Sequence, residues 1–544
     1  MVNRGEIYEY ELKKGISSYL EAGKRKFLII DSYGDSQIKA VAIAQHFSYE
    51  MNKDGVDFRI DEHTGSVPDR VLTDCIFLLP VGDLKERIST VDEQLLEIVE
   101  KEASNALIVD DASYNDNDNN CFYLHGLKLQ NFRKYSEAAF SFRKGINLLI
   151  GNNGAGKTSA LAALSVALSD FVYCLSNKFQ VSIEMEDVHS ISKKIGETTY
   201  EFEYKYPVKV KTFFNLNEDD YYFQHEVNAS ISYNKPSIIL PLSKEGFLQK
   251  SSVFPLISYQ RFDRDWNLPM KRNSTEVSIS TGAVDRLDGY KNCLSGVDHA
   301  DQIQKWCLKM SMIEFERRGE VKEFRTFQKI IDRFMKAMES EESEYLIKYS
   351  TDVSGLVYDN GHEQLPLYSL STGYKALLSM VMELAYRAVV LNPTIDSDLN
   401  ELRGIVLIDE LDAHLHPQWQ WKVLGALETV FPNVQFIIAT HSPMVISSAK
   451  NVNIIALDNG EINYVEGAYG YSVDDVLLFR QSSTNQPEVS RKYSEALDEA
   501  IDKENLVEAG NIIKKAKDEF GEESAFYKEL YQYYSMYGSE ENQG

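Results

Sequence analysis

The chain has 544 residues, several times the usual domain length of roughly 100 to 200 residues, so more than one structural unit is expected. Its 43% hydrophobic and 26% charged residues are typical of a soluble globular protein, and no apolar run approaches the ~20 residues of a membrane helix. A formal charge of −26 argues against non-specific coating of nucleic acid, because phosphate binding requires a basic surface. The start of the chain, MVNRGEIYEYELKK, lacks an apolar signal core, so we expect a cytoplasmic protein without membrane contact.

The first 115 residues are predicted to form a small α/β domain. Between residues 24 and 113, short β-rich runs (KFLIID, DCIFLLPV, ALIVDDAS) alternate with helical runs (IKAVAIAQHFSYEM, VDEQLLEIVEKE), which is typical of βαβ units with a parallel sheet. The polar run NDNDNN at 115–120 cannot build a core and predicts a linker. No catalytic set stands out before it, so we expect a docking or regulatory surface, with a degenerate nucleotide-binding or Toll-receptor-like module as the alternative.

A second domain is predicted over residues 122–460. It opens with the alternating run YLHGLKLQNF and the buried-looking strand INLLI, followed by a glycine-rich loop and a helix. Between about 170 and 364, β-like runs are followed by helical runs without a strong catalytic pattern, which indicates an inserted α+β lobe. Residues 461–544 are acidic, and from Glu488 onward apolar residues recur at helical spacing, which predicts a helical cap or partner surface.

Cysteines and basic residues give weaker signals. The five cysteines form no C-x-x-C pair, so neither a zinc site nor a disulfide framework is indicated, and we expect core thiols. A basic stretch from Lys305 to Lys336 is a candidate nucleic-acid patch, although the solvated face of an amphipathic helix is favoured. Its members include Lys309, Arg317, Arg318, Lys322, Arg325, Lys329 and Arg333.

The segment GNNGAGKT at 151–158 matches the phosphate-binding pattern G-x-x-x-x-G-K-[ST] and lies between a strand and a helix, as that pattern requires. Its glycines let backbone N–H groups surround phosphate oxygens, Lys157 neutralises the β- and γ-phosphates, and Thr158 offers a hydroxyl to Mg²⁺. A chance glycine loop is the alternative, which the order of strand, loop and helix disfavours. The nucleotide-binding residues expected here are Asn152, Asn153, Gly154, Ala155, Gly156, Lys157, Thr158 and Ser159.

Two adjacent carboxylates, Asp409 and Glu410, end the apolar strand of ELRGIVLIDELDAHLHP. They suit different tasks: Asp409 to hold the metal through water, and Glu410 to act as general base on the attacking water. An acidic helix N-terminus is the alternative interpretation of this pair alone. About thirty residues further, FIIATHSPMV places His441 at the end of another buried strand, where a histidine can reach the γ-phosphate or the water; a packed polar residue is its alternative.

A further anion site is predicted in YSLSTGYKALLSMVMELAYRA. Ser371, Thr372 and Gly373 precede a long amphipathic helix, and small hydroxyl residues with a glycine at a helix N-terminus can bind a phosphate. On this segment alone, an ordinary N-cap without a ligand is the preferred interpretation.

The order GNNGAGKT, LSTGYK, GIVLIDE, LDAHLHP and ATHSP resembles the ABC-type ATPase heads of the SMC and OLD group, from about 122 to 460. The resemblance implies ATP and Mg²⁺ as cofactors. It makes Ser371, Thr372 and Gly373 a signature segment that contacts ATP on an opposite head, and it places Asp412 in the loop that crosses the dimer interface. It also suggests Gln260, in ISYQRF, as a ligand of Mg²⁺.

Within that group the chain resembles the PtuA ATPases of Septu and retron-associated antiphage systems, through RLDGYKNCLSG, KWCLKM, LHPQWQ and GYSVDDVLLFR. Such ATPases act with an HNH nuclease, PtuB, and in retron versions also with a reverse transcriptase and its RNA–DNA product, the msDNA. OLD nucleases carry a Toprim domain after the head. The acidic tail lacks a strand-glutamate and Asp-x-Asp arrangement, so we expect no nuclease activity in this chain.

The resemblance therefore implies a defence ATPase that dimerises head to head, or forms a higher homo-oligomer, and regulates a separate nuclease. One alternative is a DNA-repair or recombination ATPase that clamps DNA directly. A second is a scaffold whose ATP is structural and is not hydrolysed. A transporter subunit fits less well, because the insertion is long and no coupling partner is implied.

Overall fold

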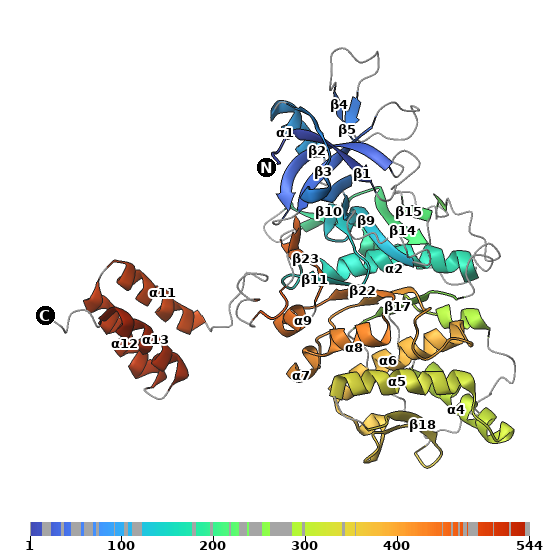
Figure 1. Cartoon of the computed structure of the whole chain (residues 1–544). Helices are drawn as coiled ribbons and strands as arrows, with labels where there is room; N and C mark the ends of the chain where they lie inside the picture. Colours follow the sequence, from blue (N-terminus) through green and yellow to red (C-terminus); the bar gives the residue numbers. More distant parts are fainter. Residues whose placement is uncertain are drawn as a thin grey trace. The chain divides into compact units, whose positions relative to one another are not determined.

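In the computed structural model the chain divides after Tyr471 into two units, Met1–Tyr471 and Ser472–Gly544 (Figure 1). The predicted linker at 115–120 and most of the β-like run at 229–240 lie outside the described residues. The structure describes residues 2–12, 23–33, 37–44, 56–58, 69–71, 75–91, 93–102, 107–110, 122–176, 181–195, 200–216, 219–227, 237–238, 253–261, 285–295, 300–339, 343–353, 355–448, 450–458, 461–465, 468–471, 476, 488–503, 505–521 and 524–538.

The N-terminal sheet is mostly antiparallel, not the predicted parallel βαβ sheet. Its strands follow the order β4-β5-β3-β2-β1-β7, with β6 beside β3 and a parallel pair of β6 and β8. The elements are β1 (Glu6–Leu12), β2 (Gly23–Tyr33), β3 (Gln37–Ala44), β4 (Val56–Phe58), β5 (Asp69–Val71), β6 (Cys75–Pro80), η1 (Val81–Asp83), β7 (Arg87–Thr90), α1 (Glu93–Glu102) and β8 (Leu107–Asp110).

The helix predicted at 38–51 is wrong over 38–44, which form β3. Ile38, Ala40 and Ala42 belong to one hydrophobic cluster of the sheet, whereas Val41 and Ile43 belong to a second cluster together with residues of α1. A strand that buries both faces has a continuous apolar run, which periodicity alone does not separate from a buried helix. The helix predicted at 91–102 is confirmed as α1 over Glu93–Glu102.

Two larger sheets build the core of the head among the described residues. An antiparallel sheet, β10-β9-β14-β15-β16, comprises β9 (Phe122–Phe132), β10 (Tyr135–Ser141), β14 (Val208–Leu216), β15 (Asp219–Val227) and β16 (Ser237–Ile238). The second sheet, β17-β21-β22-β11-β23-β24, is parallel except for β24 at its edge. Its strands are β11 (Ile146–Ile150), β17 (Leu256–Gln260), β21 (Gly404–Ile408), β22 (Val434–Ala439), β23 (Asn453–Asp458) and β24 (Glu461–Val465). The head sheet thus continues past residue 460.

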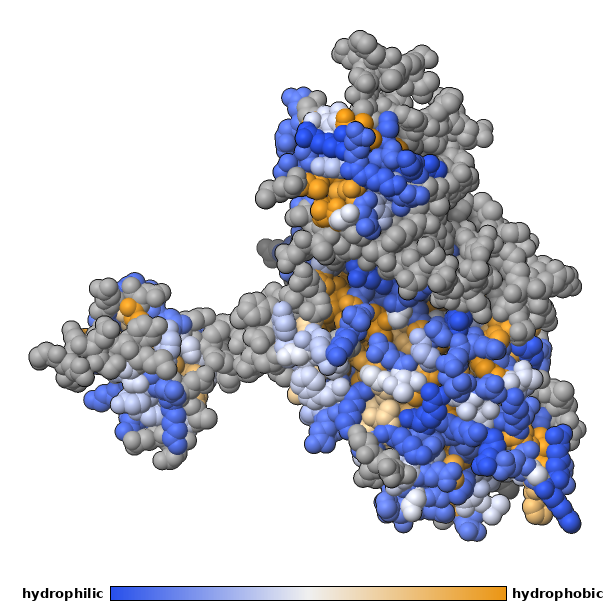
Figure 2. Space-filling model, in the orientation of Figure 1, coloured by the Kyte–Doolittle hydropathy of each residue, from blue (hydrophilic) through white to orange (hydrophobic). Residues whose placement is uncertain are grey.

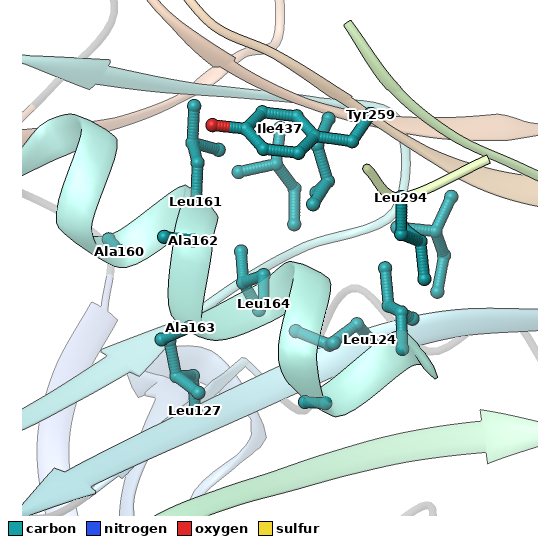
Figure 3. Packing of buried hydrophobic residues seen from close by; sticks show 14 of the residues in the cluster. Leu124, Leu127, Ala160, Leu161, Ala162, Ala163, Leu164, Tyr259, Leu294 and Ile437 are labelled. Atoms are coloured by element: carbon teal, nitrogen blue, oxygen red, sulfur yellow. The ribbon is translucent and has the colours of Figure 1, made fainter. Parts of the chain in front are cut away.

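Helix α2 (Lys157–Ser176) is the central element of the head's core. Figure 3 shows Leu161 and Leu164 of α2 among Leu124 and Leu127 of β9, Tyr259 of β17 and Ile437 of β22. This helix is long and apolar enough to cross a membrane by length and composition, but 78% of its most apolar window is buried inside the protein. Its hydropathy is therefore explained by packing between the two sheets.

Part of the predicted insertion at 170–364 belongs to the head's own sheets, because β14 pairs with β9 and β17 pairs with β21. The remaining inserted lobe combines helices and short strands. It contains η4 (Met185–Asp187), β12 (Ser190–Lys194), β13 (Tyr200–Tyr204), η5 (Arg286–Tyr290), α4 (Ala300–Arg317), α5 (Lys322–Glu339), β18 (Leu346–Ser350), β19 (Gly355–Asp359) and β20 (Gln364–Pro366). It is followed by η6 (Leu367–Ser369), α6 (Thr372–Leu391), α7 (Pro417–Gln420), α8 (Val423–Val430) and α9 (Pro443–Ser448). The mixed α/β fold class is confirmed.

Several residues of the basic stretch are engaged within the chain. Arg325 pairs with Glu320 at 2.7 Å, Lys322 pairs with Asp396 at 3.4 Å, and Arg333 donates to the carbonyl oxygen of Ser397 at 2.6 Å. In the face shown in Figure 2, residues over α4 to α8 are mainly hydrophilic. The solvated-face interpretation therefore fits these residues better than a phosphate-binding patch does.

The second unit is helical. Helices α11 (Glu488–Asp502), α12 (Leu506–Phe520) and α13 (Ala525–Gly538) pack around a cluster that includes Leu497, Ile513 and Leu530. The predicted helical character of this region is confirmed.

The cysteines of the first unit agree with the expectation of core thiols where the structure describes them. Cys293 and Cys307 are buried thiols, and burial raises the pKa of Cys293 to about 12.

Candidate active site

The predicted catalytic residues meet at one edge of the parallel sheet. Strands β17, β21, β22 and β11 are neighbours in that order and run parallel, so their carboxyl ends share an edge. Gln260, Asp409, Thr440 and Gly151 end or directly follow these strands. In open parallel sheets, ligands bind at the carboxyl ends of the strands. The topology therefore brings together segments that are more than 250 residues apart.

The loop after β11 adopts a backbone conformation that favours glycine. Gly151, Gly154 and Gly156 have φ angles of 140°, 76° and 114°. A Cβ on Gly151 would lie 2.3 Å from the carbonyl oxygen of Leu457, and one on Gly156 would lie 2.3 Å from the Tyr135 hydroxyl. Together with the N-terminus of α2, this backbone forms a cradle that fits a nucleotide phosphate.

Lys157 is a buried cation, 6% exposed, at the first turn of α2. Its Nζ donates to the carbonyl oxygens of Gly151 at 2.8 Å and Asn152 at 3.1 Å. Burial lowers the pKa of Lys157, although the nearby carboxylates Asp409 and Glu410 oppose that shift. Such a buried ammonium is suited to bind a phosphate. The charged phosphate oxygen accepts a stronger hydrogen bond from the ammonium than the neutral loop carbonyls do.

Asp409 and Thr158 form the proposed metal-binding pair. The Thr158 hydroxyl donates to Asp409 Oδ1 at 3.3 Å, and Asp409 is 8% exposed. Burial raises the pKa of Asp409, with Glu410 adding to the shift and the hydrogen bond from Thr158 opposing it. A buried carboxylate and a threonine hydroxyl supply oxygen ligands that fit Mg²⁺. The divalent cation would balance the negative charge of the Asp409 carboxylate.

Gln260 lies next to this pair. The Asp409 N–H donates to the carbonyl oxygen of Gln260 at 2.8 Å, so the two residues are adjacent across the ends of β17 and β21. Its side-chain nitrogen Nε2 donates to the Ser258 hydroxyl at 2.7 Å. An amide oxygen is a ligand type that Mg²⁺ accepts. Its position is compatible with the predicted metal-binding role.

Glu410 has a left-handed backbone, with φ of 49°, which costs a non-glycine residue about 1 kcal/mol or more. The following Leu411 N–H donates to the carbonyl oxygen of Ala439, which fixes this turn against β22 at 3.2 Å. The Glu410 carboxylate interacts electrostatically with both Lys157 and His441. Strain of this kind is typical of functional sites, where it places a side chain that a regular strand would aim elsewhere.

Asp412 has an intramolecular role in this structure. Its Oδ1 accepts hydrogen bonds from the Thr440 hydroxyl and, at 3.2 Å, from the His441 N–H. It therefore fixes the start of the histidine loop. Ser442 extends this network, because its hydroxyl donates to Gln420 Oε1 at 2.7 Å. The cross-dimer contact predicted for Asp412 remains a prediction.

Partial burial and the positive charge of Lys157 lower the pKa of His441. The unfolded chain therefore binds this proton more readily, so the free energy of unfolding falls as pH drops below about 6.5. We expect His441→Gln to reduce the loss of melting temperature between neutral and mildly acidic pH in nucleotide-free protein, measured by differential scanning fluorimetry. His362→Gln, at an exposed turn, is the control; equal pH dependence of both variants and the parent would contradict the expectation.

The signature segment begins helix α6. Ser371 is its N-cap and accepts a hydrogen bond from the Tyr374 N–H at 3.4 Å, and Ser371 and Thr372 are exposed. A Cβ on Gly373 would lie 2.6 Å from the carbonyl oxygen of His414, so the helix start packs closely on the loop after Asp412. Among the described residues, no hydrogen bond joins this segment to the phosphate loop of its own head.

Three residues at the site were not identified from the sequence. The Lys134 ammonium donates to the carbonyl oxygen of Gly154, and the Tyr135 hydroxyl donates to that of Gly156 at 3.0 Å. Arg261, directly after Gln260, interacts electrostatically with Asp409. All three residues lie beside motifs that the sequence analysis used: Lys134 and Tyr135 follow the strand YLHGLKLQNF, and Arg261 stands in ISYQRF. The sequence does not show which residues they contact.

Comparison with known proteins identifies a family for the region that carries this site. A family model described as "AAA domain, putative AbiEii toxin, Type IV TA system" (AAA_21) matches residues 146–447. "Retron Vc95 probable ATPase" from Vibrio cholerae serotype O1 biovar El Tor is 27% identical over 430 residues, covering 66% of this chain and 79% of that protein. "Septu protein PtuA" from Bacillus thuringiensis is 24% identical over 403 residues, covering 70% and 89%. These relatives confirm the resemblance that the motifs predicted.

Among solved structures, an SMC head bound to the C-winged helix domain of ScpA is 17% identical. The match covers 63% of this chain and 97% of that chain, with a TM-score of 0.37.

Proposed function

Because the chain belongs to the AAA_21 family of ATPase domains, we propose that it hydrolyses ATP in a site that two heads complete together. The observation that carries the proposal is the shared edge at which Lys157, Asp409, Glu410 and His441 meet. The exposed signature segment at the start of α6 supports the second half of the proposal, since it makes no hydrogen bond to the described phosphate loop of its own head.

Each group has one task in the proposed reaction, an in-line attack of water on the γ-phosphate. The attack forms a bond from the water oxygen to the γ-phosphorus and breaks the bond from that phosphorus to the bridging oxygen, which leaves with ADP. Lys157 and the loop amides bind and orient the phosphates, while Glu410 accepts the proton of the water as general base. His441, whose pKa is lowered by partial burial and by the charge of Lys157, holds the γ-phosphate or the water by hydrogen bonding. Thr158, Asp409 and Gln260 would hold Mg²⁺, which when bound supplies charge neutralisation on the phosphates.

The partner head would contribute Ser371, Thr372 and Gly373, with Asp412 in the loop between the heads.

We expect Gly373→Ala to abolish ATP-driven dimerisation, because its Cβ would collide with the backbone of His414 and displace the start of α6. Light scattering with bound ATP measures this. Gly425→Ala in α8 is the matched control, since its Cβ meets nothing within 4 Å and alanine favours a helix. Equal dimerisation of both variants would exclude this role for Gly373.

The relatives named as a Septu PtuA and a retron ATPase support a role in antiphage defence. We propose that the chain acts in the cytoplasm as the ATPase of such a complex and regulates a separate HNH nuclease of the PtuB type. A retron reverse transcriptase and its msDNA are further proposed partners. Nuclease activity is assigned to the partner and not to this chain.

Affinity purification of the tagged chain from its native gene neighbourhood tests these partners. The proposal expects an HNH protein, or a reverse transcriptase with a small RNA–DNA hybrid, to co-purify. Recovery of the chain with genomic DNA and without such proteins would instead support a DNA-repair or recombination clamp. That alternative predicts duplex binding by the purified chain with a steep salt dependence. The intramolecular contacts of Arg325, Lys322 and Arg333 weigh against it.

A further inference from the structure

A buried chain of polar side chains leads from Gln260 to the middle of helix α6. The amide nitrogen of Gln260 donates to the Ser258 hydroxyl at 2.7 Å, and that hydroxyl donates to Glu383 Oε1 at 3.3 Å. The three residues are at most 3% exposed. Because buried polar groups are costly unless paired, each link restricts the conformation of the next. Ser258 is therefore the bridge between the Gln260 amide and α6.

Arg387 compensates the charge of Glu383. Its Nε and Nη2 lie 3.0 Å and 2.9 Å from Glu383 Oε1, and Arg387 is 1% exposed. Its Nη1 donates to the carbonyl oxygens of Gly289 at 2.6 Å and Lys291 at 3.2 Å. The ion pair thus joins α6 to the backbone of η5 as well as to Ser258, and its geometry depends on the position of the helix.

The η5 segment is itself fastened to β17. The Tyr290 hydroxyl donates to the carbonyl oxygen of Pro255 at 2.8 Å, and the Tyr259 N–H donates to that of Cys293 at 2.7 Å. A Cβ on Gly289 would lie 2.6 Å from Leu391 Cγ, so α6 and η5 are in close contact. The RLDGY segment therefore closes a ring of contacts from β17 through α6 and back to β17.

We propose that Ser258, Glu383 and Arg387 are positioning residues that couple the Gln260 side chain to the position of α6. The proposal rests on the proposed function, which gives Gln260 a metal contact and the start of α6 a partner phosphate. α6 is one continuous helix from Thr372 to Leu391, so a displacement of its start moves Glu383. Through Ser258 that displacement reorients the amide that would hold Mg²⁺.

Ser258→Ala tests the bridge with little change in volume, and Ser379→Ala is the matched control. Ser379 is buried on α6, the helix that carries Glu383. Its hydroxyl donates to the carbonyl oxygen of Ala376 at 2.8 Å, within the same helical turn. Both changes are made in a Glu410→Gln background, which removes the proposed general base. The rise in melting temperature with ATP is then titrated against Mg²⁺, a readout that does not depend on turnover.

We expect Ser258→Ala to raise the Mg²⁺ concentration for half of the maximal shift about 2- to 10-fold, the effect of one lost hydrogen bond. Ser379→Ala should match the parent. Identical titrations for the two serine variants would overturn the coupling. Light scattering on the same samples distinguishes failure of the proposed function from failure of the coupling. A parent that remains monomeric with ATP contradicts the two-head site, whereas the Mg²⁺ titration still tests whether Ser258 affects Mg²⁺ binding.

Discussion

Glu410→Gln is expected to lower the rate of ATP hydrolysis about 10²- to 10⁴-fold and to accumulate an ATP-bound dimer. The substitution keeps the size of the side chain and removes its basicity. Glu410 lies at the carboxyl edge of the sheet, close enough to Lys157 and His441 to interact with both electrostatically. Binding should persist, because the phosphate loop and Asp409 are unchanged. Phosphate release gives the rate, and light scattering gives the mass.

Glu401→Gln is the matched control, since Glu401 is an exposed residue just before β21. It should hydrolyse ATP at the parent rate and should not accumulate a dimer. Hydrolysis by Glu410→Gln at the parent rate would show that another group activates the water. A parent protein that retains bound ATP intact for hours would instead support the structural-ATP scaffold.

Lys157→Met is expected to weaken ATP binding about 10- to 100-fold, the range for a lost charge-assisted hydrogen bond. The nucleotide-free protein should keep or raise its melting temperature. Burial lowers the pKa of Lys157, which means that the folded protein disfavours the charged ammonium, and methionine removes that charge while keeping an apolar stem. Titration calorimetry measures the affinity, and scanning fluorimetry measures the melting temperature.

Lys309→Met on α4 is the control for the loss of one positive charge, and it should bind ATP as the parent does. Parent-like affinity in Lys157→Met would contradict the assignment of the phosphate loop. A lower melting temperature of Lys157→Met without nucleotide would show that Lys157 stabilises the nucleotide-free loop, and would contradict the idea that its buried charge costs stability until a phosphate binds.

The local motifs made much of the candidate site predictable. The phosphate loop, the Asp409–Glu410 pair and His441 each follow a fully buried, mostly apolar strand, and parallel strands end at a common edge. The sequence could not show that Asp412 fixes the histidine loop through Thr440, because that contact depends on how two strand ends pack. The same limit applies to Lys134, whose partner Gly154 is supplied by another strand and loop.

Burial of charge was also hidden in the sequence. Glu383 and Arg387 stand four residues apart in a helix, a spacing that is typical of exposed ion pairs. In the structure both are buried, because β17 and η5 cover that side of α6. In the N-terminal sheet, Ile38 and Val41 face opposite hydrophobic clusters, so no alternation of polar residues marked β3 as a strand.

Mixing two inactive variants tests most directly whether two heads complete the site. Lys157→Met damages the phosphate loop, and Ser371→Arg places a bulky cation at the exposed start of α6, so each variant alone should fail to hydrolyse ATP. In a mixed dimer, the intact phosphate loop of one chain faces the intact signature segment of the other. The account predicts that mixing restores phosphate release. A mixture as inactive as the separate variants would contradict the shared site.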